Sequence, residues 1–415
     1  MSDFLWGVST SAFQIEGAFT AGGRGPSVWD DFSPVHENQD ASVACDHYNR
    51  WREDVALMAQ LGVNAYRFSI AWPRIQPSGK GPVNTEGLDF YDRLVDALVD
   101  IDIAPVVTLY HWDTPMELEA EGGWLNRDIA DRFADYTALV ADRLADRVKL
   151  WIPINEPAMV TLQGYAIGEH APGKTLLFDA LPTAHHLNLA HGRAVDVLRS
   201  YNAQAVGTAN NHTPAWPVGP NDVAAAEAYS EIHNWIYADP MLSGRYPDAV
   251  ADLLPIADGD LATIHQPLDF YGVNYYNPTR LRAPSEGNPL PFELAEIDEY
   301  PLTGFGWPIV PAGLTEMINA LRERHPGLPP VHVTESGCSF PDEIADADRI
   351  SYLDGHLKAA QAADVSGYFV WSLLDNFEWE AGYSQRFGLV QVDYETQRRT
   401  PRDSFHWYRK VISGE

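Results

Sequence analysis

Eight short apolar segments, separated by longer amphipathic stretches, constrain the fold of this chain more than any other feature. Stretches such as residues 49–62 and 85–103 have the apolar spacing of helices that cover one face of a sheet. Apolar runs buried on both sides are typical of parallel strands, and parallel neighbours need a crossover between them. The sequence therefore predicts an α/β fold, a single (β/α)8 TIM barrel. The candidate strands are FLWGVS (4–9), AYRFSI (65–70), APVVTLY (104–110), LWIPIN (150–155), AVGTAN (205–210), DFYGVN (269–274), VHVTES (331–336) and GYFVWS (367–372).

The chain is expected to form one domain over residues 1–415. Its hydrophobic content of 45% supports a large core, and 21% charged residues argue against disorder. No Ser/Gly-rich linker divides it, and no repeat with a period of roughly 20 to 50 residues occurs. Barrels of this class reach this length as one unit when their loops carry insertions.

Charge and cysteine content exclude several kinds of partner. The 58 acidic and 28 basic residues give a formal net charge of -30, which repels phosphate backbones and anionic lipids. We therefore expect no nucleic acid and no membrane partner. Cys45 and Cys338 are too few for a disulfide framework, and the N-terminal residues lack the pattern of a secretory signal. A cytoplasmic location is expected, and the oligomeric state stays open.

Polar side chains follow the predicted strands at the points where the apolar runs end. The carboxyl ends of barrel strands meet at one face, where barrel enzymes hold their active sites. One such residue is ordinary at the rim of a barrel, but their recurrence on most of the strands indicates a functional site. These residues are Gln14, Glu16, Arg67, His111, Trp112, Asn155, Glu156, Asn274, Tyr276, Glu335 and Trp371.

Two glutamates, Glu156 in INEP and Glu335 in TESG, each follow an apolar strand. An ionised carboxylate there is costly unless it is paired. Two carboxylates about 5 to 5.5 Å apart can hydrolyse a glycoside with retention, because one attacks the anomeric carbon while the other protonates the leaving oxygen. Repulsion between them would keep the acid protonated near neutral pH. The alternative is a pair of structural glutamates that neutralise Arg67 or another base.

Seven motifs together resemble glycoside hydrolase family 1, the retaining β-glucosidases. They are FLWGVSTSAFQIEGA, YRFSIAWPRI, YHWDTP, INEP, GVNYY, TESG and WSLLDNFEWEAGYSQRFGL, and the resemblance runs from about residue 3 to 409. It implies Glu156 as acid/base and Glu335 as nucleophile, with no metal and no cofactor. It also implies three residues that orient or polarise the nucleophile, namely Arg67, Asn274 and Tyr276. The sugar would be held by Gln14, His111, Trp112, Asn155, Glu378 and Trp379, with Trp371 beneath its ring and with His170 and Trp307 on the aglycone side.

Departures from the family pattern leave the catalytic atoms in place. Ser336, Thr114 and Phe13 stand where most members have Asn, Leu and Tyr. Members that act on 6-phosphosugars differ from this chain at Glu378, where a carboxylate would repel a phosphate. The expected substrates are therefore small unphosphorylated β-glucosides, with β-galactosides and β-fucosides as alternatives, and cellobiose degradation is the expected context. The partners are this small-molecule substrate and water.

Three rival interpretations compete with this one. Residues 168–175, GEHAPGKT, match the P-loop pattern, but Pro172 lacks a backbone N–H and no strand fits before the segment. The stretch also resembles the HAPG loop of family 1. His185, His186 and His191 do not form the i, i+4 pair of a helical zinc site. A non-catalytic sugar-binding barrel is the alternative from another class, and it would require the loss of a glutamate.

Overall fold

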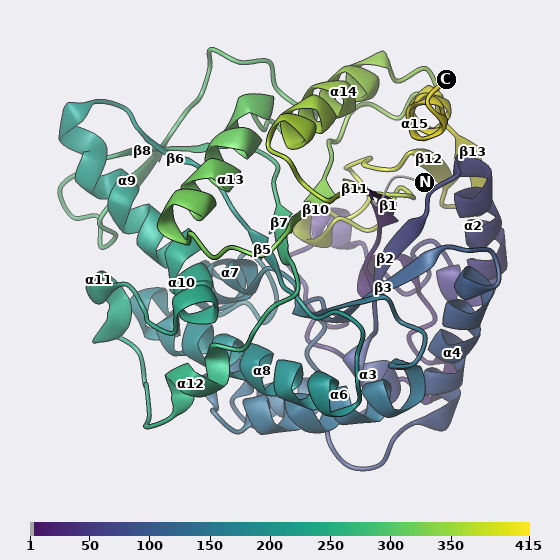
Figure 1. The fold of residues 1–415 in the computed structure, drawn as a ribbon, viewed down its shortest axis with the longest axis horizontal. Helices are drawn as coiled ribbons and strands as arrows, with labels where there is room; N and C mark the ends of the chain where they lie inside the picture. The colour runs from purple at the N-terminus through teal and green to yellow at the C-terminus, as the bar shows by residue number, and fades with distance from the viewer. Residues whose placement is uncertain (1–3) are drawn as a thin grey trace.

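Eight parallel strands form a barrel at the centre of the computed structural model, which describes residues 4–415 (Figure 1). The hydrogen-bonded order is β4-β3-β2-β1-β11-β10-β7-β5, and bridges from Trp151 to Val206 and from Asn155 to Ala209 close the ring between β4 and β5. The predicted (β/α)8 barrel is confirmed. The strands are β1 (Leu5–Ser9), β2 (Ala65–Ser69), β3 (Ala104–Tyr110), β4 (Leu150–Ile154), β5 (Ala209–Asn211), β7 (Tyr271–Asn274), β10 (Val331–Ser336) and β11 (Gly367–Trp371).

The fifth strand is shorter than the sequence predicted. The apolar run starts at residue 205, but continuous pairing starts at Ala209 and ends at Asn211. The backbone N–H of Val206 donates instead to the Asp269 side chain at 2.7 Å. The first part of this segment therefore joins the barrel through a single bridge rather than through a ladder.

Helices surround the barrel and bury their apolar stripes against the strands (Figure 1). In α4 the buried residues include Leu88, Tyr91, Leu94, Val95 and Leu98, which repeat with the helical period. The predicted helices at 49–62 and 85–103 are observed as α2 and α4. The main helices are α2 (His47–Leu61), α4 (Thr85–Val99), α6 (Ile129–Leu144), α8 (Leu181–Ser200), α9 (Val223–Ser230), α10 (Ile236–Ser243), α13 (Pro311–Arg324), α14 (Ala347–Ala362) and α15 (Asp403–Ser413).

Shorter elements extend the loops at the ends of the strands. One small sheet joins β6 (Ala215–Pro217), β8 (Thr279–Arg282) and β9 (Glu293–Ala295), and a hairpin joins β12 (Val390–Asp393) to β13 (Arg398–Pro401). The short helical segments are α1 (Ala12–Ile15), α3 (Trp72–Ile75), α5 (Met116–Ala120), α7 (Pro157–Met159), η4 (Val160–Ile167), η5 (Leu177–Ala180), η7 (Glu231–Trp235), α11 (Asp248–Ala251), α12 (Asp260–Ile264) and η8 (Trp379–Ala381).

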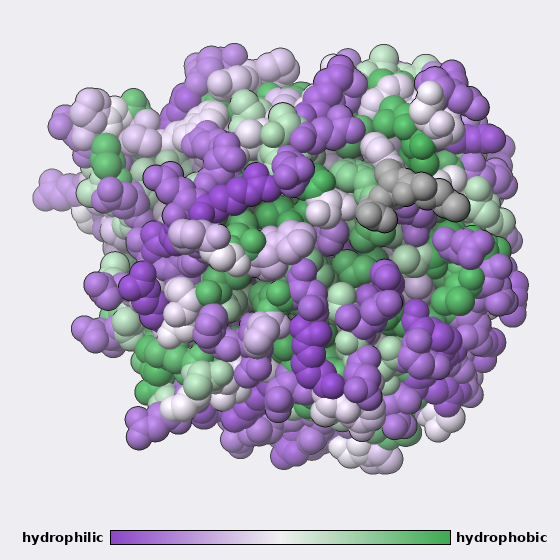
Figure 2. Space-filling model, in the orientation of Figure 1, coloured by the Kyte–Doolittle hydropathy of each residue, from purple (hydrophilic) through white to green (hydrophobic). Residues whose placement is uncertain are grey.

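The surface in the view of Figure 2 is mostly hydrophilic, with hydrophobic residues in small separate groups. Between residues 4 and 415, no helix has the length and apolar composition needed to cross a membrane.

The inside of the barrel changes from apolar to polar along the strand direction. One layer is apolar and contains Val106, Ile152 and Phe369. Gly7 makes room for the Phe369 ring, because a Cβ at residue 7 would lie 2.2 Å from a ring carbon. Ala65 of β2 belongs to this apolar layer. Arg67, two residues further along the same strand, is a buried cation. The polar end of the barrel is therefore the end to which the carboxyl termini of the strands point.

Replacing Phe369 tests the apolar layer. Because its side chain is fully buried, we expect Phe369→Ala to lower the free energy of unfolding by about 3–5 kcal/mol. Phe178→Ala is the matched control, since Phe178 is 37% exposed and should cost about 1 kcal/mol or less. Chemical denaturation measures both, and equal losses would contradict the assignment of Phe369 to the core.

Candidate active site

A pocket of about 330 Å³ opens at the carboxyl ends of the barrel strands. Its volume is in the range of small-molecule sites. Most of the residues predicted for the site line it, namely His111, Trp112, Glu156, His170, Tyr276, Trp307, Glu335, Trp371, Glu378 and Trp379. Four others lie directly behind this lining and are almost completely buried, namely Gln14, Arg67, Asn155 and Asn274. The structure thus brings the predicted residues together in two shells.

Glu335 is held by a cation and a phenol. Arg67 forms a buried ion pair with Oε1 of Glu335, and the Tyr276 hydroxyl donates to Oε2 at 2.7 Å. A β-bulge aims this carboxylate, because β10 has one extra residue between Val333 and Glu335 relative to β7, and one extra residue between Val333 and Ser336 relative to β11. Successive side chains in a regular strand point to opposite faces. Here both Thr334 and Glu335 reach polar groups of the barrel interior.

Glu156 receives only neutral donors. The amide of Asn274 donates to its Oε1 at 2.7 Å, and the amide of Asn211 donates to the same oxygen at 3.3 Å. Burial, and then the negative charge of Glu335, raise the pKa of Glu156 to about 8, against the opposing effect of the two amides. At neutral pH this carboxyl group therefore holds its proton.

One predicted contact differs in the structure. Asn274 was expected to orient the nucleophile candidate Glu335, but its amide nitrogen donates to Glu156 and to Asn155 instead. Its oxygen accepts a hydrogen bond from the Thr334 hydroxyl. The bulge in β10 explains this, because Asn274 pairs with Glu335 along the backbone while Thr334 faces its side chain.

His111 is a neutral imidazole with one N–H group that has no hydrogen-bond acceptor among residues 4–415. Burial and the nearby Arg67 hold the pKa of His111 well below its usual value. The amide nitrogen of Asn155 lies 3.1 Å from Nε2, and Oδ1 of Asn155 accepts from Arg67. Nε2 is therefore the acceptor and Nδ1 carries the proton. That Nδ1 is buried without a partner, which points to a ligand as its acceptor.

Aromatic rings build one wall of the pocket. The Trp112 and Trp379 ring centroids are 4.5 Å apart, and His111 stacks near Trp371 with a centroid distance of 5.9 Å. Trp307 packs against Tyr276 at 5.3 Å, and His170 lies with Nε2 2.8 Å from the Glu380 carboxylate. The wall offers apolar faces on which a pyranose ring can stack.

Gln14 is hydrogen-bonded to residues 376–378, which lead into the part of the wall that carries Trp379. Its amide nitrogen donates to Asn376 and to the Phe377 carbonyl, each at 2.9 Å, and its oxygen accepts from Ser11 at 2.6 Å. The Glu378 carboxylate lies 3.4 Å from the same nitrogen. Burial, with the charges of Glu380 and Glu335, raises the pKa of Glu378 well above its usual value. Gln14, predicted as a direct sugar contact, is fully buried beside Glu378 in this structure.

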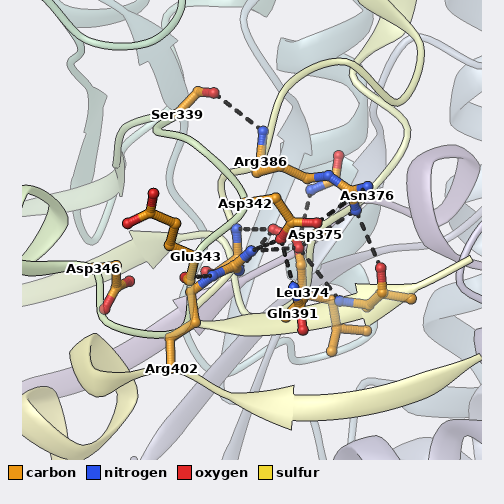
Figure 3. A network of polar contacts seen from close by, with 12 residues as sticks. Ser339, Asp342, Glu343, Asp346, Leu374, Asp375, Asn376, Arg386, Gln391 and Arg402 are labelled. Atoms are coloured by element: carbon orange, nitrogen blue, oxygen red, sulfur yellow. Dashed lines mark hydrogen bonds and ion pairs between the residues drawn. The ribbon is translucent and has the colours of Figure 1, made fainter.

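A buried ion pair anchors the segment that carries Glu378 and Trp379 (Figure 3). Asp375 is fully buried and accepts two hydrogen bonds from Arg402, each of 2.9 Å. The backbone N–H of Gly388 also donates to Asp375, and Arg402 reaches Asp342 on the loop after β10. Residues far apart in the chain therefore hold this part of the wall in place.

Three residues of the pocket have left-handed backbone dihedral angles, which residues other than glycine rarely adopt. They are Trp112 with φ of 77°, Glu156 with φ of 45° and Trp379 with φ of 51°. Each such conformation costs on the order of 1–3 kcal/mol and persists only where the surroundings impose it. The same backbone conformation occurs at other residues away from the pocket, such as Ala44 and Asp102, but at these three it sets the direction of groups that face the pocket.

The sequence model of Glycosyl hydrolase family 1 matches residues 1–415. The chain belongs to glycosyl hydrolase family 1. A beta-glucosidase A of Thermotoga maritima is 42% identical over 99% of this chain and 97% of the relative. A bifunctional beta-D-glucosidase/beta-D-fucosidase of Bifidobacterium breve is 44% identical over 99% of this chain and 97% of the relative. The solved family 1 β-glucosidase from T. maritima has a TM-score of 0.96 at 41% identity, covering 100% of this chain and 98% of that chain.

Sequence reasoning overlooked three residues of this glycosyl hydrolase. Asn211 ends β5 and contacts Glu156, so the rule of polar residues at strand ends would have found it. His233 lies 2.9 Å from Asn211 Oδ1 and turns the amide nitrogen toward Glu156. Trp29 is buried, and its ring centroid lies 4.6 Å from that of Trp379 behind the pocket wall.

The rival motifs have structural explanations. Residues 168–175 follow the helical segment η4 rather than a strand, so the geometry of a P-loop is not present. His185 lies 2.9 Å from both Tyr246 and Asp260, and His186 lies 2.8 Å from the Trp124 carbonyl. His191 is fully buried in α8. Over residues 4–415, no group of three His, Cys, Asp or Glu side chains could hold a metal ion.

Replacing Asp375 tests the anchor of the wall. Asp375→Ala leaves the buried Arg402 without its main counter-charge, so we expect the free energy of unfolding to fall by about 3–5 kcal/mol. Asp354→Ala removes the partner of Lys358 in an exposed pair and should cost about 0.5 kcal/mol or less. Chemical denaturation compares the two, and a loss at Asp375 as small as at Asp354 would refute the anchoring role.

Proposed function

We propose that this family 1 glycosyl hydrolase is a retaining β-glucosidase that removes terminal, non-reducing β-D-glucosyl residues from small glycosides. The observation that supports this most strongly is the pair of buried carboxyl groups in one pocket, Glu335 bound to a guanidinium and Glu156 bound only to amides. Glycoside hydrolysis with retention needs one ionised and one protonated carboxyl group. We extend the range of sugars to β-D-galactosyl and β-D-fucosyl residues and include cellobiose among the substrates.

In the first step, Glu335 attacks the anomeric carbon and forms a covalent glycosyl ester. Glu156 gives its proton to the leaving oxygen as the glycosidic bond breaks. Tyr276 donates to Oε2 of Glu335 and so limits how the carboxylate can rotate. Oε1 stays beside Arg67, which orients the attacking group.

In the second step, water cleaves the ester with retention of configuration. Once Glu335 is esterified it has no charge, so the repulsion that helped to raise the pKa of Glu156 is lost. Glu156, which gave up its proton in the first step, then accepts one from the attacking water. The water adds to the anomeric carbon, and Glu335 leaves as a carboxylate.

The proposed sugar contacts follow from the lining of the pocket. Trp371 offers an indole face to the apolar side of the pyranose, and the free Nδ1–H of His111 suits a hydroxyl oxygen. Gln14, Trp112, Asn155, Glu378 and Trp379 complete the proposed set, and the Gln14 amide nitrogen lies 3.4 Å from the Glu378 carboxylate. The negative charge of Glu378, when ionised, disfavours a 6-phosphate. His170 and Trp307 are proposed for the aglycone side.

We further propose a cytoplasmic location, with a small-molecule β-glycoside and water as partners and with neither nucleic acid nor a membrane. Cys45 and Cys338 are both buried thiols without a disulfide, which suits a reducing compartment. The net charge of -30 disfavours nucleic acid.

An azide experiment tests the two catalytic assignments. With 2,4-dinitrophenyl β-glucoside, Glu335→Ala should lose detectable turnover, and added azide should restore product as the α-glucosyl azide because only one displacement occurs. Glu156→Ala with azide should instead give the β-glucosyl azide, since Glu335 still forms the ester. Glu53→Ala, at an exposed glutamate, is the control. Wild-type protein that turns over no β-glycoside would favour a sugar-binding barrel. If Glu335→Ala gave the β-glucosyl azide and Glu156→Ala the α-glucosyl azide, the roles of the two glutamates would be exchanged.

The pH dependence tests the protonation state of Glu156. Because the acid must hold its proton, kcat/KM for an alkyl β-glucoside should fall above pH 8, where Glu156 ionises. In Glu156→Gln, residual turnover of 2,4-dinitrophenyl β-glucoside should lack this basic limb, since that leaving group needs no proton. A basic limb at the same pH in the variant would show that another group titrates.

A further inference from the structure

A second cavity, which we call the apolar chamber, adjoins the catalytic pocket. It has a volume of about 400 Å³ and lies between η4, η5, the start of α8, η7 and residues 288–294. Its apolar lining includes Leu162, Ile167, Leu177, Phe178, Phe292 and Leu294. Ile167 and Leu294 are 40% and 64% exposed. Such exposure of apolar surface is costly in water and is typical of a binding surface.

The chamber and the catalytic pocket share a wall. Four residues line both cavities, namely Met159, Gln163, Tyr229 and His233. Met159 lies in α7, which starts directly after Glu156, and His233 contacts Asn211 beside that carboxyl group. The shared wall is therefore on the side of the pocket where the leaving oxygen must receive its proton. A group in the chamber would belong to the leaving alcohol of the substrate.

The polar groups that line the chamber indicate which kind of leaving alcohol it can hold. The Thr161 hydroxyl accepts from Thr183 at 2.9 Å, and the Tyr229 hydroxyl lies 3.2 Å from His233 Nδ1, so each already has a hydrogen-bond partner in the protein. A second sugar would leave its hydroxyls without partners there, which costs free energy. Asn288 and Glu293 also line the chamber, and they are hydrogen-bonded to each other. Gln163 differs from these polar residues, because its Oε1 is buried without a partner at the shared wall. This oxygen marks the point where a ligand changes from polar to apolar.

We propose that the apolar chamber binds the unbranched alkyl chain of the leaving alcohol, and that the enzyme therefore prefers long-chain alkyl β-glucosides to short ones. This proposal rests on the proposed β-glucosidase function. The bond between the anomeric carbon and the glycosidic oxygen breaks, that oxygen takes the proton of Glu156, and the fatty alcohol leaves from the chamber. No further reactant is needed besides water.

A chain-length series measures the effect. We expect kcat/KM for methyl, butyl, hexyl and octyl β-glucosides, each below its micelle concentration, to rise about three- to fourfold for every methylene that enters the chamber. In the double variant Ile167→Asp/Leu294→Asp the charged rim should remove this rise, so that the octyl to methyl ratio falls at least tenfold. Leu253→Asp is the matched control, because Leu253 is 53% exposed outside both cavities, and it should keep the wild-type ratio.

Two outcomes would overturn the proposal. One is a kcat/KM that does not change with alkyl chain length in an enzyme that hydrolyses p-nitrophenyl β-glucoside. The other is an equal rise of kcat/KM with chain length in the wild type and the double variant. Calorimetry with octyl and methyl β-thioglucosides separates this failure from failure of the proposed function, since these glycosides resist hydrolysis. Tighter binding of the octyl compound would support the chamber even without turnover, and equal binding would refute it. If kcat/KM does not change with chain length and the protein self-associates through Leu294, the apolar chamber is instead a contact surface for a second copy of the chain.

Discussion

The buried guanidinium of Arg67 is the interaction on which the polar end of the barrel depends. It donates to the Thr334 carbonyl and forms close hydrogen bonds to the side chains of Glu335 and Asn155, so one rigid fork joins strands β2, β4 and β10. A cation with 1% exposure is tolerated only when its donors are matched by acceptors and its charge by an anion. Glu335 supplies the charge, and the same pairing gives that carboxylate its fixed place in the pocket.

The difference between the two catalytic candidates follows from this pairing. Because the cation lies on Glu335, Glu156 is left with the neutral amides of Asn274 and Asn211. Burial and the nearby negative charge then favour its protonated form. Two residues of the same type thus differ in their partners, a cation for Glu335 and amides for Glu156, which suits them to different roles. The polar network is also costly to assemble, and the left-handed backbone at Trp112, Glu156 and Trp379 adds to that cost.

The surrounding structure offsets this cost at a distance from the chemistry. The apolar layer around Phe369 lies inside the barrel below the polar end, and the Asp375–Arg402 pair holds the wall segment from the side of the C-terminal hairpin. On the opposite side, η4 and η7 hold the residues that separate the catalytic pocket from the apolar chamber. The barrel strands supply the reacting groups, while the loops decide what leaving group can reach them.

The sequence by itself determined the eight strands, the barrel and the set of polar residues at its mouth, because apolar runs and helical periodicity are local properties of the chain. Its motifs also identified the family and both glutamates. Only the tertiary structure decided which partner each polar group has. The bulge that aims Glu335, the turn of Asn274 toward Glu156, the position of Gln14 beside Glu378 and the contact of Asn211 with Glu156 all depend on the register between strands. That register forms when the barrel closes, and the apolar chamber likewise exists only where loops distant in sequence meet.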